Sequence, residues 1–178
     1  MNSAQPILYH LDYHSPLDDI RLISNAHAVI AAYFTSRVSA QEARLYAGSL
    51  PASTAEQQQL FYPVTQWLQQ YFTDPGSVPA LPVITGILAG THLQKTVWRA
   101  LCTIETGYTI SYSELALRCG RPDAVRAIAS ACGKNPLPIL IPCHRVIAKS
   151  GQLGGYTGGL DIKKWLLEWE SHALANPS

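Results

Sequence analysis

The chain has 178 residues, 47% of them hydrophobic, and a formal net charge of +1, which is ordinary for a globular protein and excludes a low-complexity chain. Its length suffices for one sizeable core or for two modest domains that share an interface. No apolar run approaches the roughly 20 residues of a membrane helix, and the N-terminus lacks the basic flank and apolar core of a signal peptide. We therefore expect a cytoplasmic protein without a membrane segment, in which Cys102, Cys119, Cys132 and Cys143 are free thiols.

The first half predicts a small antiparallel sheet followed by helices. Its strands are predicted by three runs rich in β-branched and aromatic residues: Ile7–Leu11, Ile20–Ser24 and Ala28–Phe34. Ser39 and Glu42 form a capping-box pattern that opens a helix, which we expect Gly48 to end. A second helix, opened near Pro63 and ended by the turn at 74–77, is predicted by apolar residues at helical spacing: Leu60, Val64, Trp67, Leu68 and Tyr71. A Pro-rich stretch from Val78 to about Leu88 predicts a linker, so residues 1–88 form a supporting N-terminal domain that includes it.

Residues 89–178 predict a mostly helical second domain. Thr91 is the expected N-cap of a helix that buries Leu93, Val97, Trp98 and Leu101. Two short helices follow, one from Ser113 to Gly120 and one from about Asp123 to Cys132, with Pro122 at its first position and Gly133 as its stop. A closing helix, with Asp161 as its cap, is expected to bury Ile162, Trp165, Leu166 and Trp169. The predicted fold class is therefore α+β.

The two short helices form a helix-turn-helix pattern of the winged-helix-like kind, and the charge distribution suits a nucleic acid. Residues 1–90 carry three basic and six acidic side chains, whereas residues 91–178 carry ten basic and six acidic. Excess positive charge confined to one half is expected of a surface that binds a polyanion. The alternative is a chance excess on a solvated face, and such helix pairs also occur as plain core packing.

The segment Pro138-Ile139-Leu140-Ile141-Pro142-Cys143-His144-Arg145 carries the strongest chemical signal. Prolines fix φ and remove hydrogen-bond donors, so this segment is stiff. A thiol on a stiff support, beside an imidazole, has the makings of an activated nucleophile. The alternative is a buried structural cysteine followed by an exposed histidine.

The second half resembles the O6-alkylguanine-DNA alkyltransferases, also called methylated-DNA–protein-cysteine methyltransferases. The resemblance covers roughly residues 88–170 and rests on an ordered series of motifs: Val97-Trp98, Ser111-Tyr112, Ala124-Val125-Arg126-Ala127, Gly133-Lys134-Asn135-Pro136, Ile141-Pro142-Cys143-His144-Arg145-Val146, the Gly155-Tyr156-Thr157-Gly158-Gly159 turn and Lys163-Lys164-Trp165. The first half matches more weakly. The family implies direct-reversal DNA repair, in which a suicide enzyme moves a methyl or other alkyl group irreversibly from guanine O6 to its own cysteine.

The resemblance implies a role for each matched residue. Cys143 is the nucleophile, His144 is its base acting through a water, and Glu170 orients His144. Tyr112 donates to the guanine ring and the Thr157 N–H to O6, with Tyr156 beside it in the substrate-binding turn. The carbonyls of Cys143 and Val146 accept from the exocyclic amine, and Lys163 supports the base pocket. Asn135 braces the turn before the strand expected to carry Cys143.

The guanine must also leave the duplex, because O6 lies inside the base stack. The resemblance makes Arg126 the side chain that takes the place of the flipped nucleotide, on an alanine-rich helix that includes Ala127 and fits a narrow groove. Arg121 is a further expected DNA contact. The implied partner is double-stranded DNA containing O6-alkylguanine, bound by a monomer that needs no protein partner and no cofactor.

Three other classes stay open at this point. An alkyltransferase-like protein would flag lesions without repairing them, but that class lacks the reactive cysteine. A helix-turn-helix regulator would leave Cys143 an incidental core thiol. A metal site is disfavoured because the sequence has no C-x-x-C pair and no cysteine before Cys102, where some relatives hold zinc. The preference among alkyl groups, activity on O4-alkylthymine and cooperative binding are not set by the sequence.

Overall fold

The computed structural model describes residues 6–79 and 90–175. Three strands form an antiparallel meander: β1 (Tyr9–His14), β2 (Asp19–Ser24) and β3 (Val29–Phe34). The predicted antiparallel sheet is thereby confirmed. A two-residue strand, β4 (Leu50–Pro51), pairs in parallel with β1 and makes the sheet mixed, in the order β3-β2-β1-β4. Sequence patterns did not indicate β4, because two exposed residues carry no periodicity.

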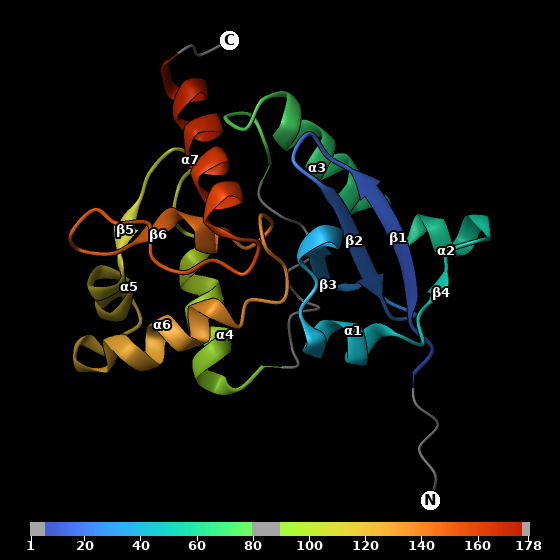
Figure 1. Cartoon of the computed structure of the whole chain (residues 1–178), viewed down its shortest axis with the longest axis horizontal. Helices are drawn as coiled ribbons and strands as arrows, with labels where there is room; N and C mark the ends of the chain where they lie inside the picture. The colour runs from blue at the N-terminus through green and yellow to red at the C-terminus, as the bar shows by residue number, and fades with distance from the viewer. Residues whose placement is uncertain (1–5, 80–89, 176–178) are drawn as a thin grey trace, which may run out of the picture.

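The two faces of the sheet pack differently, because neighbouring residues of a strand point to opposite sides. Ile20 and Leu22 join the main core on one face, while Ile23, on the other, packs in a small cluster with Tyr33 and Tyr46. Figure 1 shows α3 (Tyr62–Thr73) lying along the sheet and α1 (Ala40–Tyr46) near the lower ends of the strands. One face of the sheet therefore packs in the main core with α3 and the C-terminal half, and the other packs in the small cluster that includes Tyr46 of α1.

The first helix, α1, begins where local capping predicts. Ser39 and Glu42 make the expected capping box at α1, which is preceded by a short 3-10 turn, η1 (Thr35–Arg37). Helix α3 has its proline in the first turn and ends at Asp74, as predicted, but Leu60 lies before it. A short helix, α2 (Ala55–Gln59), precedes α3 and was not predicted. The predicted linker falls mostly on residues 80–89, so it and the boundary between residues 88 and 89 lie outside the described residues.

The second half is mostly helical, as expected. Helix α4 (His92–Leu101) begins at a capping box made by Thr91 and Gln94. Helix α5 (Tyr112–Arg118) begins earlier than predicted, because Ser111 and not Ser113 caps it. Pro122 opens a 3-10 turn, η3 (Pro122–Ala124), which runs into α6 (Val125–Gly133).

The last elements bring the cysteine segment and the closing helix together. A 3-10 turn, η4 (Cys143–Arg145), leads into β6 (Val146–Ile147), which pairs in parallel with β5 (Ile110–Ser111). The closing helix is α7 (Leu160–Ala175). The prediction that Asp161 caps it is wrong: Asp161 lies inside the helix, and its carboxylate accepts a hydrogen bond from Arg37 at 2.7 Å. Arg37 can reach that carboxylate because the N-terminal half packs against this end of α7.

One hydrophobic core runs through both halves. It contains Leu22 of the sheet, Leu68 of α3, Trp98 of α4 and Leu166 of α7, all 4% exposed or less. The two predicted domains therefore share a continuous interior. Within residues 6–79 and 90–175, no helix is long and apolar enough to cross a membrane.

Candidate active site

The segment before Cys143 is rigid for reasons that its backbone shows. Ile139 has a φ of 71°, an unusual value for a β-branched residue, and its side chain is 1% exposed. The Ile141 N–H donates to the Leu137 carbonyl at 2.8 Å, and the Cys143 N–H donates to the Ile141 carbonyl at 2.7 Å. Cys143 therefore opens the 3-10 turn η4 and does not lie on a strand, which corrects the expectation of a strand. Two prolines and this folded-back chain leave no room for extended pairing.

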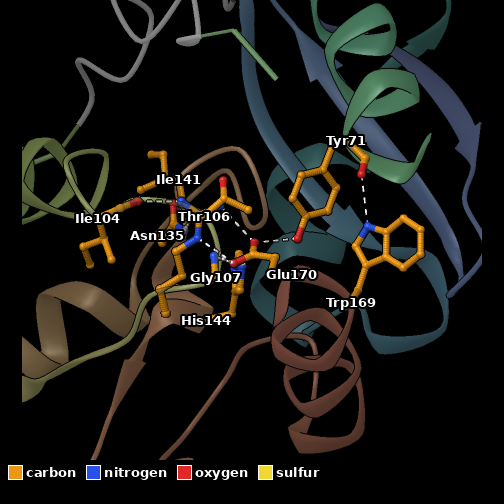
Figure 2. Close-up of polar contacts among 10 residues, drawn as sticks. Tyr71, Ile104, Thr106, Gly107, Asn135, Ile141, His144, Trp169 and Glu170 are labelled. Atoms are coloured by element: carbon orange, nitrogen blue, oxygen red, sulfur yellow. Dashed lines mark hydrogen bonds and ion pairs between the residues drawn. The ribbon is translucent and has the colours of Figure 1, made fainter. Parts of the chain in front are cut away.

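Asn135 holds the segment at Ile141 (Figure 2) and also contacts the sulfur of Cys143. Its Nδ2 donates to the Ile141 carbonyl at 2.8 Å and to Cys143 Sγ at 3.0 Å, while its Oδ1 accepts the Leu137 N–H at 3.0 Å. The sequence predicted only the bracing role. Burial raises the pKa of the Cys143 thiol, opposed by the Asn135 amide and by the charge of Lys163. The resting sulfur is thus a neutral thiol with a donor already in place to stabilise a thiolate.

His144 and Glu170 form a buried pair. Glu170 Oε1 lies 2.7 Å from His144 Nε2, and neither side chain is exposed. Burial lowers the pKa of His144 and outweighs the opposing charge of Glu170. Burial also opposes ionisation of Glu170, yet His144 and Arg145 hold the pKa of Glu170 well below its usual range. Since an ionised carboxylate can only accept, the imidazole proton lies on Nε2 and the Nδ1 lone pair is free to take a proton.

Glu170 collects further donors that the motif did not reveal. Arg145 Nε donates to Oε2 and Arg145 Nη2 to Oε1, both at 2.9 Å, and the Gly107 N–H donates to Oε2 at 3.1 Å. Arg145 Nη1 also donates to the Ile104 carbonyl at 2.6 Å. Arg145 belongs to the motif, so its position next to His144 was the available signal. Gly107 had none, because its contact comes from a backbone amide.

A cavity of about 490 Å³ opens beside Cys143. Its lining is the nucleophile, two tyrosines and mostly small residues: Tyr112, Ala129, Cys132, Gly133, Cys143, Gly155, Tyr156 and Thr157. Burial raises the pKa of Tyr112 to about 12, so its hydroxyl stays protonated and can donate. The pairing of Ser111 with Ile147 brings Tyr112 from α5 to the same place as Cys143. Cys132 was not predicted at this site.

The glycine turn forms the outer wall of this cavity. Gly154 has a φ of 67°, and a Cβ there would lie 3.2 Å from the Tyr112 ring. A Cβ on Gly158 would lie 2.7 Å from the Phe34 ring of β3. Glycine at these two positions lets the turn approach Tyr112 on one side and the sheet on the other.

Three of the predicted substrate-binding residues lie behind the cavity and do not line it: Asn135, Val146 and Lys163. Lys163 is fully buried, and its Nζ donates to the Val146 carbonyl at 2.6 Å and to the Leu153 carbonyl. Burial lowers the pKa of Lys163. Lys163 thus ties α7 to β6 and to the chain just before the glycine turn.

The predicted DNA-contacting residues are exposed. Arg126 and Ala127 lie on α6, and Arg121 lies in the turn before it. Arg126 precedes the cavity residue Ala129 by three positions, so both lie on neighbouring parts of one helix face. Another basic residue, Arg118, is paired with Glu114 at 2.7 Å.

No cluster of three or more metal-ligating side chains occurs in residues 6–79 and 90–175. The site that the structure does assemble is a buried thiol with an amide donor, a neutral histidine on an ionised glutamate, and an adjoining cavity. Such an arrangement is typical of proteins whose own cysteine acts as a nucleophile.

Comparisons with known proteins identify the family. The family model described as 6-O-methylguanine DNA methyltransferase, DNA binding domain, matches residues 92–172. The methylated-DNA–protein-cysteine methyltransferase of Haemophilus influenzae is 34% identical over 163 residues, 92% of this chain and 86% of that protein. The human protein of the same name is 41% identical over 117 residues, which span 64% of this chain and 56% of the human one. The chain belongs to the methylated-DNA–protein-cysteine methyltransferase family.

Solved structures agree over nearly the whole chain. The O6-methylguanine methyltransferase of Mycobacterium tuberculosis superposes with a TM-score of 0.79 at 33% identity, covering 94% of each chain. Mycobacterium tuberculosis OGT in complex with DNA gives a TM-score of 0.75 at 32% identity, covering 93% of each chain. The α+β architecture predicted from the sequence is confirmed.

Proposed function

We propose that the chain repairs DNA by moving an alkyl group from guanine O6 to Sγ of Cys143, once per molecule. The supporting observation is Cys143 itself: its sulfur accepts the Asn135 amide at 3.0 Å and borders the cavity. A bond forms between sulfur and the alkyl carbon, and the bond from that carbon to O6 breaks. The thiol proton ends on the restored guanine, so the reaction needs no cofactor and no second reactant.

His144 takes the thiol proton through a water in this proposal. Its Nδ1 is buried and has no hydrogen-bond partner among the described residues, while its Nε2 is engaged by Glu170. The fixed tautomer therefore directs the basic nitrogen away from Glu170. The resulting imidazolium is stabilised by Glu170, in the same way that the acid of a hydrolytic triad stabilises its histidine.

Guanine is held and activated by donors at the cavity wall. We propose that the Tyr112 hydroxyl donates to the ring and the Thr157 N–H to O6. The carbonyls of Cys143 and Val146 accept from the exocyclic amine. Each carbonyl already accepts one donor within the chain, the Val146 N–H and Lys163 Nζ respectively, and keeps a second lone pair for the base.

Helices α5 and α6 act as a helix-turn-helix that binds duplex DNA, and the target nucleotide is rotated out of the stack. The two helices pack against each other, and Arg126 extends from α6 into solvent. The DNA complex of the Mycobacterium tuberculosis relative supports binding of the same polymer here. Arg126 fills the space of the flipped nucleotide.

The proposal places the protein in the cytoplasm as a monomer. Every residue of the proposed site comes from one chain, so no second copy is needed to complete it. The four cysteines are free, and a reducing compartment keeps Cys143 as the thiol that the chemistry requires.

Mass spectrometry tests the proposed function directly. After incubation with duplex DNA containing O6-methylguanine, the peptide that carries Cys143 should gain one methyl group, and a second addition of substrate should remain unrepaired. An unmodified duplex is the control. DNA binding with no gain in mass on any peptide would mean that the chain is a lesion-binding protein or a regulator.

The role of Arg126 has its own test. Arg126→Ala should slow methyl transfer from duplex DNA by about tenfold or more, because the flipped nucleotide loses its substitute in the stack and flipping costs a few kcal/mol. Transfer from free O6-methylguanine base should stay unchanged. The matched control is Arg99→Ala, which removes an exposed arginine of α4. Equal losses on duplex and free base would contradict this role.

A further inference from the structure

The N-terminal half reaches the proposed site at three places. The Ala32 N–H of β3 donates to the Pro136 carbonyl at 2.8 Å, next to Asn135. Phe34 packs against Gly158 of the glycine turn. The third contact comes from α3 and is made to Glu170 of the His144–Glu170 pair. The sequence predicted this half only as a support.

That third contact is made by Tyr71. Its side chain is completely buried, and its hydroxyl donates to Glu170 Oε1 at 2.7 Å (Figure 2). The same oxygen receives His144 Nε2 at 2.7 Å. Trp169 Nε1 donates back to the Tyr71 carbonyl at 3.0 Å, so two hydrogen bonds lock α3 to α7 at this point.

We propose that Tyr71 is a positioning residue for alkyl transfer, which acts on His144 by sharing Glu170 Oε1 with it. This inference rests on the proposed function. Arg145 Nη2 also donates to this oxygen, so three donors compete for its charge and each bond is weaker than it would be alone. The Tyr71 hydroxyl therefore limits how strongly Glu170 stabilises the imidazolium, and it fixes the direction from which Oε1 meets the ring. His144 stays neutral and ready to accept a proton.

The other titratable groups around the pair stay in place when the hydroxyl is removed. Arg145 of η4 binds both oxygens of Glu170, Lys163 of α7 acts on His144 through its charge, and the Tyr156 ring meets His144 edge-on at 6.4 Å between centroids. Cys143 precedes His144 on η4, and the charge of Arg145 acts on Cys102 at the end of α4. A change in His144 after loss of the hydroxyl is therefore assigned to Tyr71.

Tyr71→Phe removes the hydroxyl and keeps the ring. The stacked contact with Trp67 and the edge contact with Phe72, both at 5.3 Å between centroids, remain. Oε1 then accepts hydrogen bonds from His144 and Arg145 alone. Its stronger interaction with His144 favours the imidazolium and raises the pKa of His144. Because His144 must be neutral to accept the thiol proton, the acid limb of the pH–rate profile should move to higher pH by roughly half a unit. Single-turnover transfer at saturating duplex should therefore slow by up to about threefold at a pH on this acid limb, with DNA affinity unchanged.

The control is Val64→Ala on the same helix. Val64 is buried in the core and its truncation removes packing without touching Glu170. It should destabilise the fold by about 1–3 kcal/mol and leave the pH–rate profile where it is. The inference would be overturned if the pH–rate profile of Tyr71→Phe superposed on that of the wild type. It would also be overturned if the rate fell and the acid limb stayed at the same pH.

A second measurement does not depend on activity. The pKa of His144, followed by the 15N chemical shifts of its imidazole, should be higher in Tyr71→Phe than in the wild type. If the wild-type protein takes no methyl group but this shift is observed, the proposed function fails and the coupling stands. If transfer is normal and the pKa of His144 is the same in both proteins, the coupling alone is wrong.

Discussion

Cys143→Ser should abolish methyl transfer to the protein while the affinity for duplex DNA containing O6-methylguanine stays within about twofold of the wild type. A serine hydroxyl is ionised far less readily than a thiol, and the oxygen is a weaker nucleophile toward carbon. The substitution is nearly isosteric, so the hydrogen bond from Asn135 and the shape of the cavity are kept. Quenched-flow transfer and a binding titration on the same DNA measure the two quantities separately.

Two other cysteines make this experiment specific. Cys102→Ser should transfer normally, because Cys102 lies at the end of α4 outside the cavity lining. In the wild type, no methyl should appear on Cys132, although Cys132 lines the same cavity. Burial raises the pKa of both thiols, and the Asn135 amide on Sγ favours the thiolate of Cys143. A methyl group on Cys132 in the Cys143→Ser protein would show that position alone, and not activation, selects the acceptor.

Glu170→Gln should lower the free energy of unfolding by about 3–5 kcal/mol, the usual cost of leaving a buried ion-pair partner uncompensated. Glu170 has no exposed surface and neutralises Arg145, whose guanidinium is also buried. Methyl transfer should slow by about 100-fold or more, because the imidazolium of His144 loses its stabilising charge. Chemical denaturation and single-turnover transfer measure the two effects.

The control for Glu170→Gln is a second glutamate on the same helix, α7. Glu168→Gln removes an exposed carboxylate that pairs loosely with Lys164, and it should change stability by less than about 1 kcal/mol. The folded pKa of Glu170 is held below the value of 4.5 for a free glutamate. The stabilisation from its ionised form is therefore complete above about pH 4.5 and is lost as pH falls further. The difference in the free energy of unfolding between wild type and Glu170→Gln should become smaller over that acidic range. A difference that does not change with pH would argue against an ionised Glu170.

Local features of the fold could be predicted because neighbouring residues decide them. The capping boxes at Ser39 and Thr91 depend on a side chain three positions away, and both form as expected. The choice between Ser111 and Ser113 as a cap could not be made locally, since pairing of β5 with β6 fixes it. Asp161 was assigned to a cap because its true partner, Arg37, is 124 residues away.

The candidate site likewise has a part that could be predicted from neighbouring residues and a part that depends on distant ones. Cys143, His144 and Arg145 are adjacent, so the sequence alone drew attention to them, and resemblance added Glu170 and Asn135. The structure places these five residues in two adjoining hydrogen-bonded groups, one of Asn135 with Cys143 and one of Glu170 with His144 and Arg145. Their catalytic roles remain predictions. Tyr71 stood out only as part of the apolar face of a helix and of the weaker family match in the first half. Its role at the site could not be predicted, because its hydroxyl meets a carboxylate 99 residues away.

The bond from the Ala32 N–H to the Pro136 carbonyl joins the two halves through backbone atoms alone. Such a link makes no demand on the side chain at either position, so substitutions can accumulate in β3 while the strand continues to hold the loop that carries Asn135. Docking by main-chain atoms therefore ties the position of this loop to the backbone of β3 and not to the identity of its side chains.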